Sequence, residues 1–139
     1  MHPILIAASS VICMNQAPVQ NQAFPEKLEL AVSARGLLSL RVLEAGAESP
    51  AVAKNGHEYA VTRVKAEEEK RFRVPTYYVN DNPRGDLFAN DERDTATYLF
   101  LEPSVLAGEP GRAKLWLHYA GDGYRGVEAN RYNCKGEAR

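Results

Sequence analysis

The sequence predicts a mostly β fold, because short runs with an apolar residue at every second position are separated by turn residues. A period of two places alternate side chains on opposite faces of an extended strand. The clearest runs are residues 95–101 and 114–119. About seven to eight such runs predict a single-domain antiparallel β-sandwich or open barrel.

The N-terminal segment 1–23 has two interpretations. Residues 3–14 are too short an apolar stretch to cross a bilayer but match the apolar core of a secretory signal peptide, with cleavage after Ala17 or Ala23. The absence of Lys and Arg before this stretch argues against a signal peptide. The alternative is an N-terminal strand plus connector. A single β domain is predicted over 24–139.

Two strands joined by a tight turn are predicted next. Residues 34–36, Ala-Arg-Gly, indicate a hairpin turn in which Gly36 adopts positive φ. The apolar residues that alternate in the two strands are Leu28, Leu30 and Val32 in the first, and Leu38, Leu40 and Val42 in the second.

The middle of the chain predicts a loop, two strands and a charged connection. Residues 44–56 are rich in Ala, Gly and Ser and indicate a loop, whereas alternation over 59–64 and 72–78 indicates strands. Segment 65–71 has good helix formers but no apolar stripe, so we expect a solvated hairpin tip. Pro75 lacks a backbone donor and predicts a sheet edge or a bulge.

The C-terminal half continues the strand pattern. A polar, acidic loop over 80–94 precedes a strand over 95–102, and a region rich in Pro and Gly leads to a strand over 113–120. The Gly-Asp-Gly of 121–123 indicates a turn. The last strand is predicted over 124–134.

Composition limits the classes of function. The 139 residues fit one domain large enough to bury its own core. Seventeen Lys and Arg residues against eighteen Asp and Glu residues give a net charge of −1, which offers a polyanion no long-range attraction. We therefore expect neither nucleic-acid binding nor a membrane span.

Two cysteines, Cys13 and Cys134, lie near the two ends of the chain. In an oxidising compartment they can form a disulfide that closes a loop of about 120 residues and stabilises the fold by about 4–5 kcal/mol. If segment 1–23 is cleaved, Cys134 remains as a single thiol. Neither cysteine has the spacing of a zinc site.

The acidic loop resembles an EF-hand calcium loop when it is counted from Asn80, because Gly85 falls at the sixth position, where the turn needs glycine. Arg84 at a ligand position and the predicted flanking strands depart from that pattern. Clustered carboxylates can bind calcium in other geometries, and the alternative is a solvated surface loop. The candidate calcium ligands are Asp81, Asp86 and Asp91.

Hydrolase chemistry requires a nucleophile within reach of a base, usually histidine. His118 and the adjacent Tyr119 are the candidate catalytic residues, although a structural role for His118 is the alternative interpretation. A site in the mouth of a barrel also needs polar residues that face inward. Thr97 and Arg131 meet this requirement with His118 only if the strand register aligns them.

Aromatic residues concentrate in the second half of the chain, and tyrosines on both faces of strands leave some rings exposed. Protein interfaces are enriched in Tyr, Trp and Arg, which is consistent with a binding surface, and the equally weighted alternative is that the rings cap the ends of the sheet. The predicted partner-binding residues are Tyr77, Tyr78, Asp86, Phe88, Asp91, Tyr124 and Arg125.

Two functions follow from these observations. The first is a non-enzymatic protein-binding domain of a bacterial envelope, an inhibitor or immunity-type protein that binds a cell-wall hydrolase or a toxin through an aromatic-rich sheet face and the acidic loop. The second is a small-ligand-binding barrel or small hydrolase that uses His118. Calcium is the one cofactor considered, and the expected location is the periplasm or the exterior, with the cytoplasm as the alternative.

Overall fold

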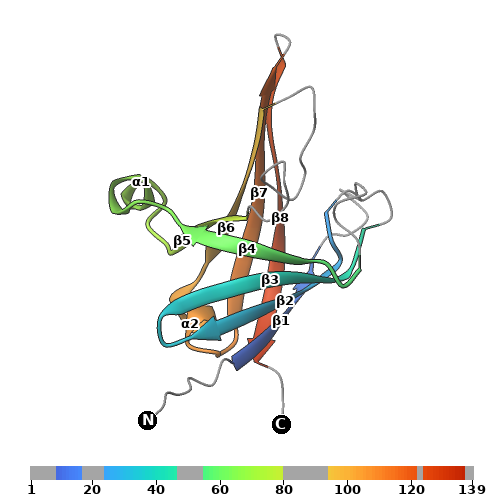
Figure 1. Ribbon diagram of the computed structural model, residues 1–139, viewed down its shortest axis with the longest axis vertical. Coiled ribbons are helices and arrows are strands. Elements are labelled where there is room, and N and C mark those ends of the chain that lie inside the picture. Colours follow the sequence, from blue (N-terminus) through green and yellow to red (C-terminus); the bar gives the residue numbers. More distant parts are fainter. Residues whose placement is uncertain (1–8, 17–23, 47–54, 80–93, 122–123, 137–139) are drawn as a thin grey trace.

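The chain folds into a closed barrel of eight antiparallel strands, in which each strand pairs with the next and the first pairs with the last (Figure 1). The computed structural model describes residues 9–16, 24–46, 55–79, 94–121 and 124–136, with the backbone alone for 94–96, 117–121 and 124–128. The strands are β1 (Ser9–Asn15), β2 (Lys27–Ser33), β3 (Gly36–Glu44), β4 (Glu58–Arg63), β5 (Thr76–Val79), β6 (Asp94–Leu101), β7 (Gly111–Gly121) and β8 (Tyr124–Gly136). The predicted mostly β, single-domain class is confirmed, and the barrel is closed.

Alternating apolar side chains fill the interior, as the period of two predicts. Leu28, Leu30 and Val32 of β2 are buried, and so are Leu99 and Leu101 of β6. An eight-stranded barrel is just wide enough for side chains to fill it. The largest fully buried side chains are Tyr59, Tyr132, Phe24, Leu28, Leu30, Leu40, Leu99, Leu101, Leu115, Val11 and Val32.

Strand β3 departs from the predicted alternation because it contains two bulges. Its pairing with β2 skips Leu38 and Leu43. Leu38 is therefore 50% exposed, while Leu37 takes the inward position at 7%. The prediction that Leu38 shares the buried face of Leu40 and Val42 is wrong, because one inserted residue reverses the alternation beyond it. The bulges also add the bending that barrel closure requires.

The turn between β2 and β3 confirms the predicted hairpin. Gly36 has a φ of 116°, a backbone conformation that side chains with a Cβ rarely adopt. The Tyr77 hydroxyl lies 2.6 Å from the position that a Cβ of residue 36 would take. The same hydroxyl accepts a hydrogen bond from the backbone N–H of Leu37 at 3.1 Å. Glycine at this position therefore lets β5 support the hairpin.

The segment predicted as a solvated hairpin tip forms helix α1 (Ala66–Phe72). Three glutamates in its first turn and two basic residues in its last turn complement the helix dipole, and Arg73 ends the helix in the left-handed conformation with φ 65°. No residue of α1 is fully buried, which explains the missing apolar stripe. Charge placement and contacts at the helix end stabilise α1 instead.

The turn region after β6 contains a second helix, α2 (Pro103–Leu106), with Pro103 at its first turn. Val105 of α2 is fully buried in the core, so this short helix covers the end of the barrel at which β7 begins. Pro75 directly precedes β5, where its missing N–H interrupts no strand pairing. The predicted strand over 72–78 is correspondingly shorter, because Phe72 belongs to α1.

Cys13 of β1 and Cys134 of β8 are directly paired and form a disulfide with 4.0 Å between their Cα atoms. The predicted pairing is confirmed, and it links the two strands that close the barrel. Disulfides persist in oxidising compartments, which favours an extracytoplasmic location. Cleavage after Ala17 or Ala23 would remove β1 and Cys13, and with them the closed sheet.

Candidate functional site

Five aromatic side chains form a contiguous group on the outside of the barrel, here named the outer aromatic cluster. Ring centroids lie 4.9 Å apart for Phe72 and Phe100, 4.9 Å for Tyr78 and Tyr98, and 5.6 Å for Phe100 and Trp116. Aromatic pairs attract one another over such distances. The cluster joins α1, β5, β6 and β7 and consists of Phe72, Tyr78, Tyr98, Phe100 and Trp116.

Strand register creates this cluster. Tyr98 pairs with Tyr78 on one side and with Trp116 on the other, and paired residues project from the same face of a sheet. The neighbours of Tyr98 in β6, Thr97 and Leu99, are buried in the interior, so the three rings face outward. The barrel core therefore does not account for these rings.

One end of the cluster is fixed to α1 by hydrogen bonds. The hydroxyls of Tyr78 and Tyr98 donate to the Glu68 carboxylate at 3.1 Å and 3.2 Å. Burial raises the pKa of Tyr98 above its ordinary value, and the contact with the Tyr78 hydroxyl raises it further. Tyr98 therefore stays a neutral donor at physiological pH, and the two hydrogen bonds to Glu68 hold α1 against the strands.

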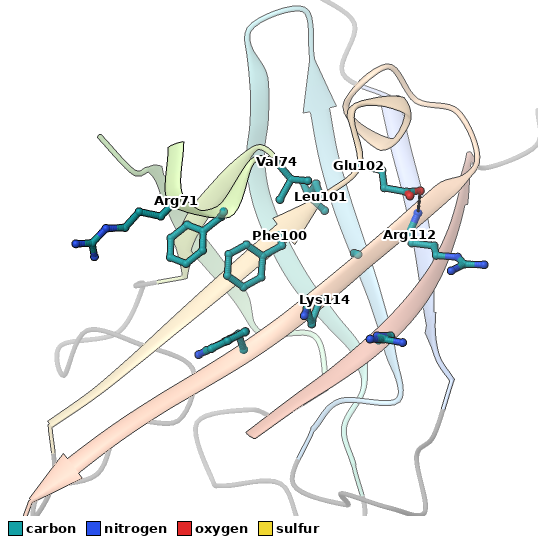
Figure 2. Close-up of a pocket in the computed structure, with 11 residues that line it drawn as sticks. Arg71, Val74, Phe100, Leu101, Glu102, Arg112 and Lys114 are labelled. Atoms are coloured by element: carbon teal, nitrogen blue, oxygen red, sulfur yellow. Dashed lines mark hydrogen bonds between the residues drawn. The ribbon is translucent and has the colours of Figure 1, made fainter. Parts of the chain in front are cut away.

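The other end of the cluster opens into a groove of about 430 Å³, here named the outer groove. Figure 2 shows Phe100 at its centre and Arg71 and Arg112 on opposite sides. Its apolar floor includes the rings of Phe72 and Trp116. The residues that line it are Arg71, Phe72, Val74, Phe100, Leu101, Glu102, Arg112, Ala113, Lys114, Trp116 and Arg131.

Basic side chains dominate the rim of the outer groove. Arg71, Arg112 and Arg131 are exposed, and Lys114 is half-buried. The Lys114 Nζ lies 5.2 Å from the centroid of the Trp116 ring, within the range of a cation–π contact. Glu102 is the one acidic lining residue, and its carboxylate accepts a hydrogen bond from the backbone N–H of Arg112 at 2.7 Å (Figure 2).

A second network ties α1 to the barrel on the opposite side. The Arg63 guanidinium donates to Glu69 at 2.9 Å, and the backbone N–H of Thr76 donates to the same carboxylate at 2.9 Å. These bonds, the Arg63 bond first, lower the pKa of Glu69. Because Glu69 bridges β4 and β5, it fixes the helix that forms one wall of the outer groove.

The outer face of β1–β4 carries polar side chains that contact one another, together with the exposed side chains of Met14 and Leu38. Glu29 accepts hydrogen bonds from the Ser10 hydroxyl and, at 2.8 Å, from the Arg41 guanidinium. The Ser10 bond and then Arg41 lower the pKa of Glu29. Ser39 donates to Glu58 at 3.0 Å. Only a shallow hollow of about 120 Å³ lies among these residues.

Two of the predicted partner-binding side chains can be placed. Tyr78 belongs to the outer aromatic cluster, but Tyr77 is 3% exposed and packs in the core. Tyr77 is therefore removed from the predicted surface, because adjacent strand residues point to opposite faces. Asp81, Asp86, Phe88 and Asp91 lie outside the described residues, and so do the side chains of Tyr124 and Arg125.

The register does not align the residues of the predicted barrel-mouth site. Thr97 is buried in the interior and pairs with Leu117, whereas His118 pairs with Ala96. Arg131 is exposed and lines the outer groove. The side chains of His118 and Tyr119 lie outside the described part of the chain.

The chain matches no family model, no curated protein sequence and no solved structure. In the part of the chain that the structure describes, neither helix is long and apolar enough to cross a membrane. The same residues contain no group of three or more His, Cys, Asp or Glu side chains placed to hold a metal ion. The candidate site rests on the geometry of the outer aromatic cluster and the outer groove.

Proposed function

We propose that this chain is a non-enzymatic protein-binding domain that contacts its partner through the outer aromatic cluster and the outer groove. The observation that carries the proposal is a chain of five touching rings on the outside of a barrel whose interior is already filled. Interface centres are enriched in aromatic residues and arginine. The cluster and its basic rim have this composition.

The finer form of the proposal is an inhibitor or immunity-type protein of a bacterial envelope, in the periplasm or secreted. The disulfide that closes the barrel supports an oxidising compartment. A cell-wall hydrolase or a toxin is the partner we propose.

The test is retention of a partner from native envelope extract by the immobilised protein. We expect the wild type to retain one partner, and Trp116→Ala to weaken that complex by about 2 kcal/mol, because central aromatic residues dominate interface energies. Leu38→Ala is the matched control, since Leu38 is exposed on β3 away from the cluster. Equal retention by the Trp116 variant and the wild type, or retention of no partner, would overturn the proposal.

One observation favours the second function, a small-ligand-binding barrel or hydrolase. The Thr97 hydroxyl is buried inside the barrel and has no hydrogen-bond partner among the described residues. Such a group usually has a partner, and a ligand can supply one. Because His118 pairs with Ala96 and not with Thr97, the variant that tests this hypothesis is Thr97→Val, which should abolish ligand binding at an unchanged melting temperature. A variant that only loses stability would show that Thr97 is structural.

A further inference from the structure

The basic side chains of the outer-groove rim differ from Arg41 and Arg63 in forming no salt bridge with a described residue. Arg41 and Arg63 each form a salt bridge, to Glu29 at 2.8 Å and to Glu69 at 2.5 Å. No salt bridge within the described residues involves the four basic side chains of the groove rim. These four side chains are Arg71, Arg112, Lys114 and Arg131.

The floor of the groove is apolar and suited to a single apolar side chain or a small group of them. The rings of Phe72, Phe100 and Trp116 line it, and its volume of about 430 Å³ falls in the lower part of the roughly 300–1,000 Å³ range of ligand pockets. The Lys114 Nζ lies 5.9 Å from the Phe100 ring and 5.2 Å from the Trp116 ring. Positive charge thus borders the apolar floor directly.

The one carboxylate among the lining residues does not pair with these cations through a salt bridge. Glu102 accepts a hydrogen bond from the backbone N–H of Arg112, and the Arg112 guanidinium forms no salt bridge with any residue that the structure describes. A ligand with negative charge on both sides of an apolar group would match this arrangement, because complementary charges favour association.

We infer that the outer groove binds an acidic protein segment, in which an apolar anchor side chain enters between Phe72, Phe100 and Trp116 and flanking carboxylates contact the basic rim. The inference rests on the proposed protein-binding function and specifies the chemistry of the partner. A protein segment is favoured over a long polyanion because the whole chain carries a net charge of −1, which opposes nonspecific polyanion binding.

Trp116 makes the groove directly observable, because it is the only tryptophan in the chain. The experiment titrates the full disulfide-bonded protein with a peptide in which a Phe–Leu pair is flanked by acidic residues, and follows tryptophan fluorescence. We expect a saturable blue shift as the anchor excludes water from the ring. Affinity should fall steeply with added salt, because the rim is exposed.

Two control peptides and two protein variants separate the contribution of charge from that of the apolar anchor. Lysines in place of the flanking acidic residues should abolish the shift, and alanines in place of the Phe–Leu pair should weaken binding about tenfold. The double variant Arg112→Glu, Arg131→Glu should weaken binding of the acidic peptide about tenfold. Arg35→Glu, an exposed charge reversal in the β2–β3 turn, should leave it unchanged.

The other outcomes overturn the inference. Equal binding of the lysine peptide, or tighter binding of an oligothymidylate than of the acidic peptide, would exclude an acidic protein segment as the ligand. A salt-sensitive dimer seen by light scattering would make a second copy of the chain the occupant. If no peptide binds but Trp116→Ala still weakens partner retention, this inference fails while the protein-binding function stands.

Discussion

The outer faces of β1–β4 and of β5–β8 share one backbone architecture but differ in chemistry. On the first face, Ser10 and Arg41 both donate hydrogen bonds to Glu29, so these three polar side chains have partners within the sheet. On the second, aromatic rings lie beside basic residues of the outer groove that form no salt bridge with the described part of the chain. On the first face Arg41 thus pairs with Glu29, although Met14 and Leu38 are exposed there, whereas on the second face the basic side chains of the groove rim form no salt bridge with a described residue.

This difference decides where binding is expected. A charge that already has a partner must lose that contact before it binds another molecule, so a paired surface gains little from association. Arg112 and Arg131 have no such contact to lose within the described residues. Exposure alone would not separate the two faces, because Arg41 is exposed as well.

The largest expected change in the free energy of unfolding is at the disulfide between β1 and β8, where the two faces meet. Replacing both Cys13 and Cys134 by alanine should lower the free energy of unfolding by about 4–5 kcal/mol, because the bridge restricts a loop of about 120 residues in the unfolded chain. Denaturant unfolding measures this change. Reduction of the wild type should reproduce the variant, and a loss below about 1 kcal/mol would show that strand pairing alone closes the barrel.

The second prediction compares apolar side chains on the two faces. Phe100→Ala should lower the free energy of unfolding by about 3 kcal/mol, since Phe100 is 7% exposed and contacts Phe72 and Trp116. Leu38→Ala should change it by less than about 0.5 kcal/mol, because Leu38 is half exposed at a bulge. Thermal and denaturant unfolding measure both changes. If the Phe100 and Leu38 variants lose equal stability, the outer aromatic cluster is not a packed unit.

The third prediction uses alkaline pH. Tyr98→Phe should lower the free energy of unfolding by about 1 kcal/mol at neutral pH, because it removes the hydrogen bond to Glu68. Burial raises the pKa of Tyr98 above 10.0, so its contribution is complete below pH 10.0 and is lost as the pH rises through the higher folded value. The variant should therefore lose stability less steeply than the wild type above pH 10.0. Parallel curves would show that Tyr98 ionises freely.

The smallest effect is expected at the polar face. Glu29→Gln should cost less than about 1 kcal/mol at neutral pH, because the ion pair with Arg41 is solvent-accessible. The pKa of Glu29 is lowered below 4.5, so its contribution is present above pH 4.5 and is lost as the pH falls through the folded value. Acid unfolding of Glu29→Gln should be shallower than that of the wild type. Arg35→Gln, which removes an exposed charge in the β2–β3 turn, serves as the control and should unfold in acid as steeply as the wild type.

Sequence periodicity was sufficient for the class of the fold but not for its local exceptions. Alternation located the strands, and Gly36 located a turn whose positive φ is observed. The bulge at Leu38 was not predicted, because Leu37, Leu38 and Leu40 are all leucines and the sequence does not show which of them is the inserted residue. Helix α1 was missed because its stabilising contacts, Glu69 to Arg63 and to Thr76, are tertiary.

The site was only partly predictable for a related reason. The sequence indicated an aromatic-rich face and included Tyr78, which lies in the outer aromatic cluster, but it also included the buried Tyr77, because alternation does not say which of two adjacent tyrosines points outward. Phe72, Tyr98, Phe100 and Trp116 were not assigned to the site. The sequence shows that Tyr98 and Phe100 are two residues apart and so share one face of a strand. The contact between Phe100 and Phe72 depends on how α1 packs.

The sequence by itself determined that the chain is a small single-domain β protein with near-zero net charge and one feasible disulfide, because these follow from periodicity and composition. Tertiary structure decided that β1 and β8 close the sheet where Cys13 meets Cys134, and that the outer aromatic cluster lies beside arginines without a salt bridge to the described residues. The physical reason is register. Period-two patterns fix which residues share a face within one strand, whereas pairing between strands fixes which faces meet, and that pairing depends on bulges, helix contacts and closure of the whole barrel.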